Sequence, residues 1–113
     1  MTMIPSVKVI EENIYRLSTG ALKYPCYGDG FYCADFVRLL ADIPASDGAL
    51  SLQLSDCTER HIQYAKFGDI VFNKDFSHCG ISLGHPYVLH YTKHGVTYEL
   101  YINQFGGGFA YGS

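Results

Sequence analysis

The chain has 113 residues, of which 48% are hydrophobic and 17% are charged, and its formal net charge is −3 at pH 7. A chain of this length and composition is expected to form one globular domain that covers residues 1–113. Its 8 Lys and Arg residues form no basic run, which argues against binding to nucleic acid or to an anionic membrane. No apolar stretch approaches the roughly 20 residues that a membrane span needs.

The first eight residues combine neither a long apolar run with a basic region nor a small-residue cleavage site, so they do not resemble a signal peptide. We therefore expect synthesis in the cytoplasm, with a separate route of delivery for any extracellular role. The four cysteines, Cys26, Cys33, Cys57 and Cys79, are then expected to be free thiols. Their spacing contains no Cys-x-x-Cys and is unfavourable for zinc, so we expect no metal and no other cofactor.

The first half of the chain carries two helical patterns. Residues 5–18 place apolar side chains at helical intervals between a Pro-Ser start signal and Gly20 as a stop signal. An aromatic loop with two glycines is expected at 24–30, and a second helix over 31–41 with Cys33 in its first turn. Residues 50–65 are ambiguous between loop and short helix.

From Gly68 onward the hydrophobic period changes to two. This period predicts four strands, at 69–73, 77–83, 87–92 and 96–102. The glycine-rich tail that follows is expected to be partly mobile. A helical first half and a stranded second half predict an α+β fold with an antiparallel sheet.

Two histidines, His78 and His90, are placed symmetrically about Gly84. A three-residue turn with Gly84 in the left-handed conformation would make them directly opposed neighbours on adjacent strands. Alternation puts both histidines on the face that carries Gly80, where a helix can approach closely. Cys79 would then point to the opposite, more apolar face.

Cys33, His78 and His90 together have the composition of a cysteine hydrolase site. A helix N-terminus and a neighbouring imidazolium both lower the pKa of a thiol, so Cys33 is expected to be a thiolate paired with His78. His90 would orient His78, and the backbone N–H of Cys33 would stabilise an oxyanion. Alone, a cysteine in an apolar helix is more often a core residue, and the two histidines reverse that preference.

The remaining candidates have no such partners. We expect Cys26, Cys57 and Cys79 to be structural. Asp35 is expected to be a solvated charge, and Asp69 a turn former at the start of a strand.

Three segments carry further motifs: residues 32–37 (Tyr-Cys-Ala-Asp-Phe-Val), 67–72 (Phe-Gly-Asp-Ile-Val-Phe) and 78–84 (His-Cys-Gly-Ile-Ser-Leu-Gly). They resemble, in order, the Asp-Cys-Ser-Gly-Phe-Val, Pro-Gly-Asp-Leu-Val-Phe and His-Val-Gly-Ile-Tyr-Leu-Gly segments of the NlpC-type cell-wall cysteine peptidases. The third segment agrees at five of seven positions and is the most specific of the three.

This resemblance implies a papain-like core, with the nucleophile at a helix N-terminus packed on a C-terminal antiparallel sheet. It implies catalysis by Cys33, His78 and His90, and hydrolysis of an amide in peptidoglycan stem peptides, commonly at a γ-linked D-glutamyl bond. The family often places a tyrosine near the scissile carbonyl, a role that Tyr24 or Tyr27 would fill. A bare domain without a signal peptide is typical of a phage tail or lysis component, or of an effector that a secretion system delivers to the cell wall or periplasm.

Two alternatives stay open. Tyr32, Ala34 and Asp35 replace the usual residues around Cys33, which favours a catalytically silent copy of the fold used as a binding or assembly module. Retention of all three catalytic side chains favours an enzyme. Thiol-dependent acyl transfer or deamidation would use the same triad, and the sequence does not separate it from hydrolysis.

Overall fold

The computed structural model describes residues 3–113, which form three α-helices and one six-stranded sheet. The helices are α1 (Val7–Thr19), α2 (Cys33–Ala41) and α3 (Leu50–Gln53). The strands are β1 (Thr58–His61), β2 (Ile70–Phe72), β3 (Cys79–Ser82), β4 (Tyr87–Thr92), β5 (Gly95–Leu100) and β6 (Phe109–Gly112), with single 3₁₀ turns at Ile62–Tyr64 and Tyr101–Asn103. The predicted α+β class is confirmed.

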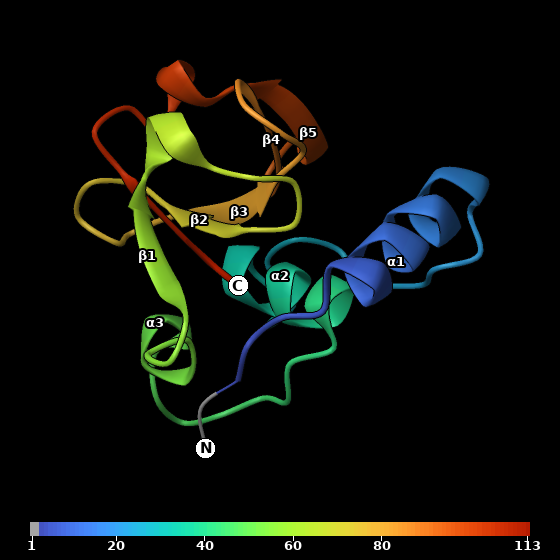
Figure 1. Cartoon of the computed structure of the whole chain (residues 1–113). Coiled ribbons are helices and arrows are strands. Elements are labelled where there is room, and N and C mark those ends of the chain that lie inside the picture. Colours follow the sequence, from blue (N-terminus) through green and yellow to red (C-terminus); the bar gives the residue numbers. More distant parts are fainter. Residues whose placement is uncertain (1–2) are drawn as a thin grey trace.

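The two longer helices form one layer beside the sheet. Ser6 caps α1 by accepting a hydrogen bond from the N–H of Val9 at 3.3 Å, and Gly20 ends the helix in the left-handed conformation at φ 80°. α2 packs against β3, β4 and α1, and α1 lies beside it (Figure 1). No helix within residues 3–113 is both long and apolar enough to cross a bilayer.

The sheet has the strand order β1-β6-β2-β3-β4-β5, and every neighbouring pair is antiparallel. β6 therefore lies inside the sheet, and the expectation of a partly mobile tail was wrong. The small residues of the tail are what allow this placement, because a Cβ on Gly112 would overlap the carboxylate of Asp69. β1 lies at the edge beside β6, in a segment where we predicted no strand.

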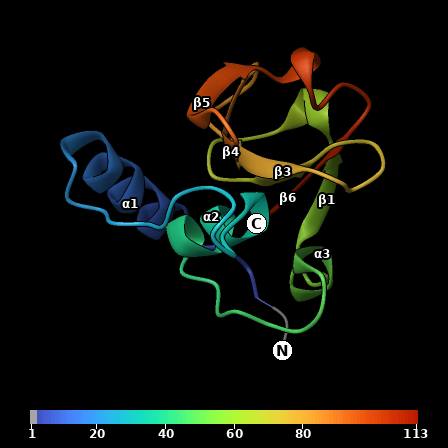
Figure 2. The ribbon, with the colours of Figure 1, turned by 180° about the vertical axis from the view of Figure 1, so that it is seen from behind.

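Both faces of the sheet are covered by apolar side chains. The larger cluster lies between the sheet and the helices and includes Ile10, Phe36, Val37, Leu40, Cys79, Ile81, Leu89 and Tyr91. The smaller cluster lies on the opposite face and consists of Ile62, Ala65, Val71, Val88, Phe105 and Ala110. Seen from behind, α2 again lies against one side of the sheet only (Figure 2). The predicted alternation holds, since Cys79 and Ile81 face the helices and Val88 faces away.

The hairpin between β3 and β4 differs from the prediction in register. Ile81 pairs with Leu89, and continuing that register places Gly80, not His78, opposite His90. A Cβ on Gly80 would lie 2.7 Å from the carbonyl oxygen of Leu89 and 2.9 Å from Cβ of His90. The glycine therefore makes room for the neighbouring strand β4, whereas the helix that we expected on this face packs against the other one.

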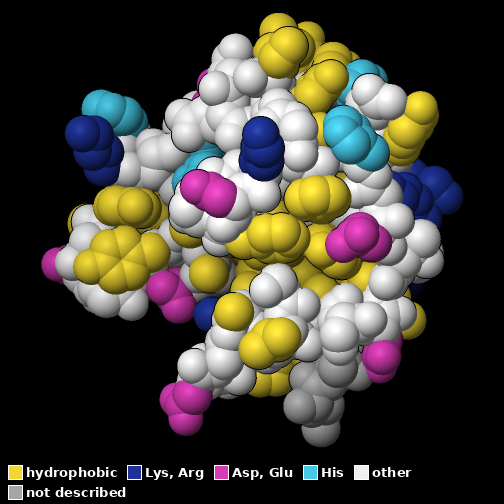
Figure 3. Space-filling model, turned by 90° about the vertical axis from the view of Figure 1, so that its left-hand side faces the viewer, with side chains coloured by type: hydrophobic (Ala, Val, Ile, Leu, Met, Phe, Trp, Pro, Cys, Tyr) yellow, Lys and Arg dark blue, Asp and Glu magenta, His cyan; other side chains and the backbone are white. Residues whose placement is uncertain are grey.

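The outer surface mixes side-chain types. On the face shown in Figure 3, hydrophobic side chains gather across the middle, and Lys, Arg, Asp, Glu and His side chains are spread around them.

Candidate active site

Cys33 is the first residue of α2, and the local sequence fixes that start. Tyr32 has an extended backbone, at φ −127° and ψ −168°, and its N–H donates a hydrogen bond to Oδ2 of Asp35 at 2.8 Å. Asp35 is therefore a helix-capping residue as well as a surface charge, which the sequence interpretation missed. As the first helical residue, Cys33 has a backbone N–H without an acceptor inside the helix.

The thiol of Cys33 is held as a thiolate by its neighbours. Its pKa is lowered to about 4, chiefly because the side chain of Cys79 hydrogen-bonds to it, with a further hydrogen bond and charge from His78. Burial of the Cys33 thiol opposes this shift. The pKa of Cys79 is raised well above its ordinary value by the same hydrogen bond and by its burial, so Cys79 keeps its proton and donates it.

Cys79 is thus the functional neighbour that sequence reasoning missed. The alternation of side chains along the strand correctly predicted that Cys79 points away from His78, toward the apolar face. That face is the one on which α2 packs, so the thiol of Cys79 meets the thiol of Cys33 there, and both line one cavity.

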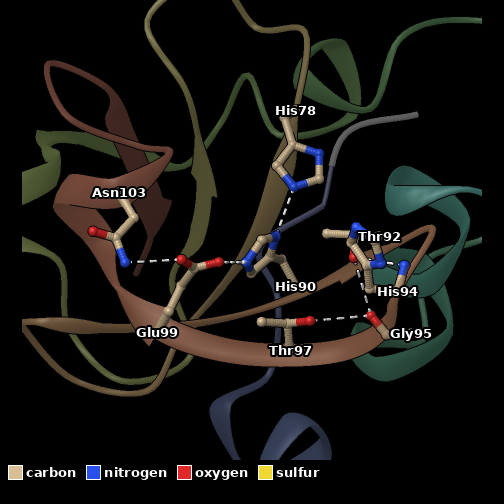
Figure 4. A network of polar contacts seen from close by, with 8 residues as sticks. All are labelled: His78, His90, Thr92, His94, Gly95, Thr97, Glu99 and Asn103. Atoms are coloured by element: carbon tan, nitrogen blue, oxygen red, sulfur yellow. Dashed lines mark hydrogen bonds and ion pairs between the residues drawn. The ribbon is translucent and has the colours of Figure 1, made fainter.

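His78 and His90 lie within hydrogen-bonding distance despite the shifted register. Nε2 of His78 is 2.7 Å from Nδ1 of His90, and the two rings meet edge to face (Figure 4). Phe105 packs against both rings from the smaller apolar cluster, with centroid distances of 5.4 Å. His90 is fully buried, and its burial lowers its pKa, so it is neutral at neutral pH.

The polar chain continues beyond His90. Nε2 of His90 is 2.6 Å from Oε2 of Glu99, whose other oxygen accepts a hydrogen bond from the side chain of Asn103 at 2.9 Å (Figure 4). The bond from Asn103 is the main reason that the pKa of Glu99 is lowered, and the bond to His90 adds to it. The sequence held a signal for Glu99, because it shares strand parity with the residue facing His90 across β4 and β5.

Cavities lie on both sides of His78. One, of about 280 Å³, is lined by Cys33, Cys79 and Phe76, among others. The other, of about 490 Å³, is lined by Tyr27 and Glu99 among others, and His78 borders both.

The two tyrosines proposed for substrate binding both pack against the ring of Tyr91 but line different cavities. Tyr27 borders the larger cavity beside His78. Tyr24 lies in a different pocket with Ile14 and Leu17 of α1. Across residues 3–113, no group of three or more His, Cys, Asp or Glu side chains is arranged to hold a metal ion.

A thiol at the start of a helix, facing an imidazole at the end of a strand of an antiparallel sheet, is the arrangement of the papain-like fold. Comparison with solved structures is consistent with this class. The crystal structure of the NlpC/p60 domain of the peptidoglycan hydrolase SagA matches with a TM-score of 0.68 and 22% sequence identity, covering 96% of this chain and 99% of that one. The chain therefore has the NlpC/p60 fold. No protein-family model matches its sequence, and no match is found among curated proteins.

Proposed function

We propose that this protein is a cysteine peptidase or amidase that hydrolyses an amide bond in peptidoglycan stem peptides through Cys33, His78 and His90. The observation that carries the proposal is the linked arrangement of the three side chains, in which a thiol with a pKa of about 4 adjoins two hydrogen-bonded imidazoles. The choice of peptidoglycan is supported by the NlpC/p60 fold, since the neighbour that shares it is a peptidoglycan hydrolase.

The reaction follows from the positions of these groups. The thiolate of Cys33 attacks the carbonyl carbon of the scissile amide, and the backbone N–H of Cys33 donates to the resulting oxyanion. Because Nε2 of His78 is engaged with His90, Nδ1 is the nitrogen free to serve the thiol and the substrate. His78 protonates the leaving amine as the C–N bond breaks, then takes a proton from the water that hydrolyses the thioester.

The substrate would extend across His78 into the cavities on either side. Tyr27 borders one of them and is the better placed of the two tyrosines to contact the peptide near the scissile carbonyl. A γ-linked D-glutamyl amide is the bond that we propose for cleavage. Delivery by a phage particle or a secretion system completes the proposal, since the substrate lies outside the cytoplasm.

The test is digestion of purified peptidoglycan sacculi, with released fragments identified by mass spectrometry. Wild type and Cys26→Ala, which alters an exposed thiol, should release the same fragments with new amino and carboxyl ends. Cys33→Ala should release none while keeping its melting temperature. A Cys33→Ala protein with undiminished release would overturn the mechanism.

The same experiment separates the alternatives. A silent binding module would hold sacculi without releasing fragments, in wild type as in Cys33→Ala. An acyltransferase would release little in buffer and would form an amide product when a primary amine is added. A deamidase would yield a mass change at a side-chain amide without breaking the stem peptide.

A further inference from the structure

The chain of contacts that starts at His78 does not end at His90. It crosses three neighbouring strands on one face of the sheet, from His78 just before β3 to His90 on β4 and Glu99 on β5, and then reaches Asn103 in the turn that follows (Figure 4). We propose that Glu99 is a positioning residue that sets the tautomer of both histidines, and that Asn103 holds Glu99 in place. This inference rests on the proposed cysteine hydrolase function.

The register explains why one line of side chains spans three strands. His90 pairs with Thr97 on β5, so Glu99 lies two residues further along that strand, on the same face. His78 is likewise offset by two residues from Gly80, which continues the register opposite His90. The steps from His78 to His90 and from His90 to Glu99 are therefore diagonal cross-strand contacts, within reach of long side chains.

The position of each proton in the chain can be worked out by starting at Glu99 and moving toward His78. Glu99 has a lowered pKa and is ionised, so it accepts hydrogen bonds and donates none. Nε2 of His90 must then carry the proton, and because burial keeps His90 neutral, its Nδ1 is an acceptor. Nε2 of His78 must therefore be protonated, which leaves Nδ1 of His78 to exchange a proton with Cys33 and the substrate.

The negative charge has a second effect. When His78 becomes an imidazolium, its Nε2–H donates to a neutral histidine that is itself bonded to a carboxylate, and this chain favours the positive charge on His78. A buried histidine without such a partner would leave one nitrogen unsatisfied and its tautomer unspecified. Glu99 stays ionised because its two oxygens accept hydrogen bonds from Asn103 and His90, and its side chain is 22% exposed.

A competing role is substrate contact, because Glu99 also borders the larger cavity beside His78. The two roles differ in what they change. A residue that binds the peptide in the ground state alters KM, whereas one that sets proton positions for the chemical step alters kcat.

The variants Glu99→Gln and Glu99→Ala separate charge from hydrogen bonding. The amide oxygen of Gln still accepts from Nε2 of His90 but carries no charge, and Ala removes both. Glu12→Gln is the matched control, because Glu12 is an exposed glutamate on α1. All four proteins are labelled with ¹⁵N, and the side-chain nitrogens of His90 and His78 are observed by NMR without substrate.

We expect wild type and Glu12→Gln to show His90 protonated at Nε2 alone. Glu99→Gln should keep this tautomer, and Glu99→Ala should show a mixture of tautomers. On a stem peptide, kcat should fall about 10-fold in Glu99→Gln and about 100-fold in Glu99→Ala, with KM changed less than about twofold.

An unchanged His90 tautomer in Glu99→Ala, or a rise in KM with kcat intact, would overturn the inference. The tautomer spectrum needs no substrate. If wild type cleaves no stem peptide but the tautomer of His90 still depends on Glu99, the proposed function fails and the positioning role stands. If wild type cleaves the peptide and the tautomer of His90 is the same in the Glu99 variants, only the positioning role fails.

Discussion

The thiol side and the imidazole side of the site are built in different ways. Cys33 lies at the helix-facing side of the sheet and is stabilised locally, by the side chain of one neighbour, Cys79, and by His78. The histidines lie on the far face and depend on a polar chain that crosses three strands. The two halves meet at the start of β3, where His78 and Cys79 are consecutive residues.

The thiolate of Cys33 and the base His78 are therefore supported by different groups. The thiolate is favoured mainly by a hydrogen bond that does not involve either imidazole, so it should persist in part without them. The imidazole side sets where protons sit and how His78 is oriented, so it should affect the chemical step more than the state of the thiol. Substitutions on each side test this division.

His78→Ala should have the largest effect on catalysis and only a partial effect on the thiol. Loss of the general acid and base should lower kcat/KM by about 10²–10⁴. In the same protein, the pH midpoint for alkylation of Cys33 should rise above the wild-type value of about 4 and stay below 9, because Cys79 still donates. The measurement is the alkylation rate of each cysteine by mass spectrometry from pH 3 to pH 10.

The exposed Cys26 is the reference thiol within the same samples. A wild-type Cys33 that titrates like Cys26 would remove the basis for a catalytic thiolate. If the alkylation midpoint of Cys33 in His78→Ala is as high as that of Cys26, the imidazole alone stabilises the thiolate, and Cys79 does not.

His90→Ala should cost less than His78→Ala, because His90 orients the base and does not exchange protons with substrate. We expect kcat to fall about 10- to 100-fold, with the Cys33 midpoint nearly unchanged. His90→Asn should retain more activity than His90→Ala, since an amide oxygen can accept from Nε2 of His78 as in Cys-His-Asn sites. Steady-state kinetics on a stem peptide, with melting temperatures for each variant, would show whether the order holds.

The sequence predicted those elements whose hydrophobic pattern lies within their own residues, and missed those that depend on pairing with distant segments. Hydrophobic periods located α1, α2 and β2 to β5, because the periodic signal of each element lies in its own residues. β6 was missed, since its glycines read as a flexible tail and its strand conformation depends on pairing with β1 and β2, far away in the chain. Tertiary pairing of this kind leaves little trace in a window of neighbouring residues.

The same limit applies to the site. Motif contexts brought Cys33, His78 and His90 into one hypothesis, and the structure brings these side chains together. Their contacts were not predictable in detail, because the hairpin register depends on the turn, and a shift of two residues still leaves the same faces inward. The role of Cys79 required knowing which face α2 covers, and that is a property of the whole packing.

Gly80→Ala should disturb the imidazole side without touching a polar group. The added Cβ would lie 2.7 Å from the backbone oxygen of Leu89 and 2.9 Å from Cβ of His90, so β3 and β4 must separate. Overpacking of this kind costs about 1–3 kcal/mol, or roughly 4–12 °C in melting temperature. Activity should fall several-fold even well below the melting transition, because the 2.7 Å contact between His78 and His90 lengthens.

Gly106→Ala is the control for that experiment. A Cβ there would lie 3.5 Å from the carbonyl oxygen of Ile102, an ordinary contact distance. Calorimetry should show little change for Gly106→Ala. Equal melting temperatures and equal activities for the two variants would mean that the strands do not approach as closely as the structure has them.

Cys79→Ala should give the smallest and most selective effect, confined to the thiol side. It removes the hydrogen bond that contributes most to the low pKa of Cys33. A hydrogen bond to a charged group contributes about 1.5–3 kcal/mol and one pKa unit equals 1.36 kcal/mol, so we expect the alkylation midpoint to rise by about one to two pH units. Alkylation near the wild-type midpoint should slow at least several-fold, and alkylation at pH 8 should hardly change.

Cys79→Ser separates the hydrogen bond from the loss of a buried side chain. The serine hydroxyl can still donate to Cys33, so the alkylation midpoint of Cys33 should stay low. Both variants remove the buried sulfur of Cys79, so both should lose similar stability. A midpoint that rises equally in Cys79→Ala and Cys79→Ser would mean that packing around Cys33, and not the donor, stabilises the thiolate. If the midpoint is unchanged in both variants and rises strongly in His78→Ala, then His78 and not Cys79 stabilises the thiolate, and the two halves of the site are not independent.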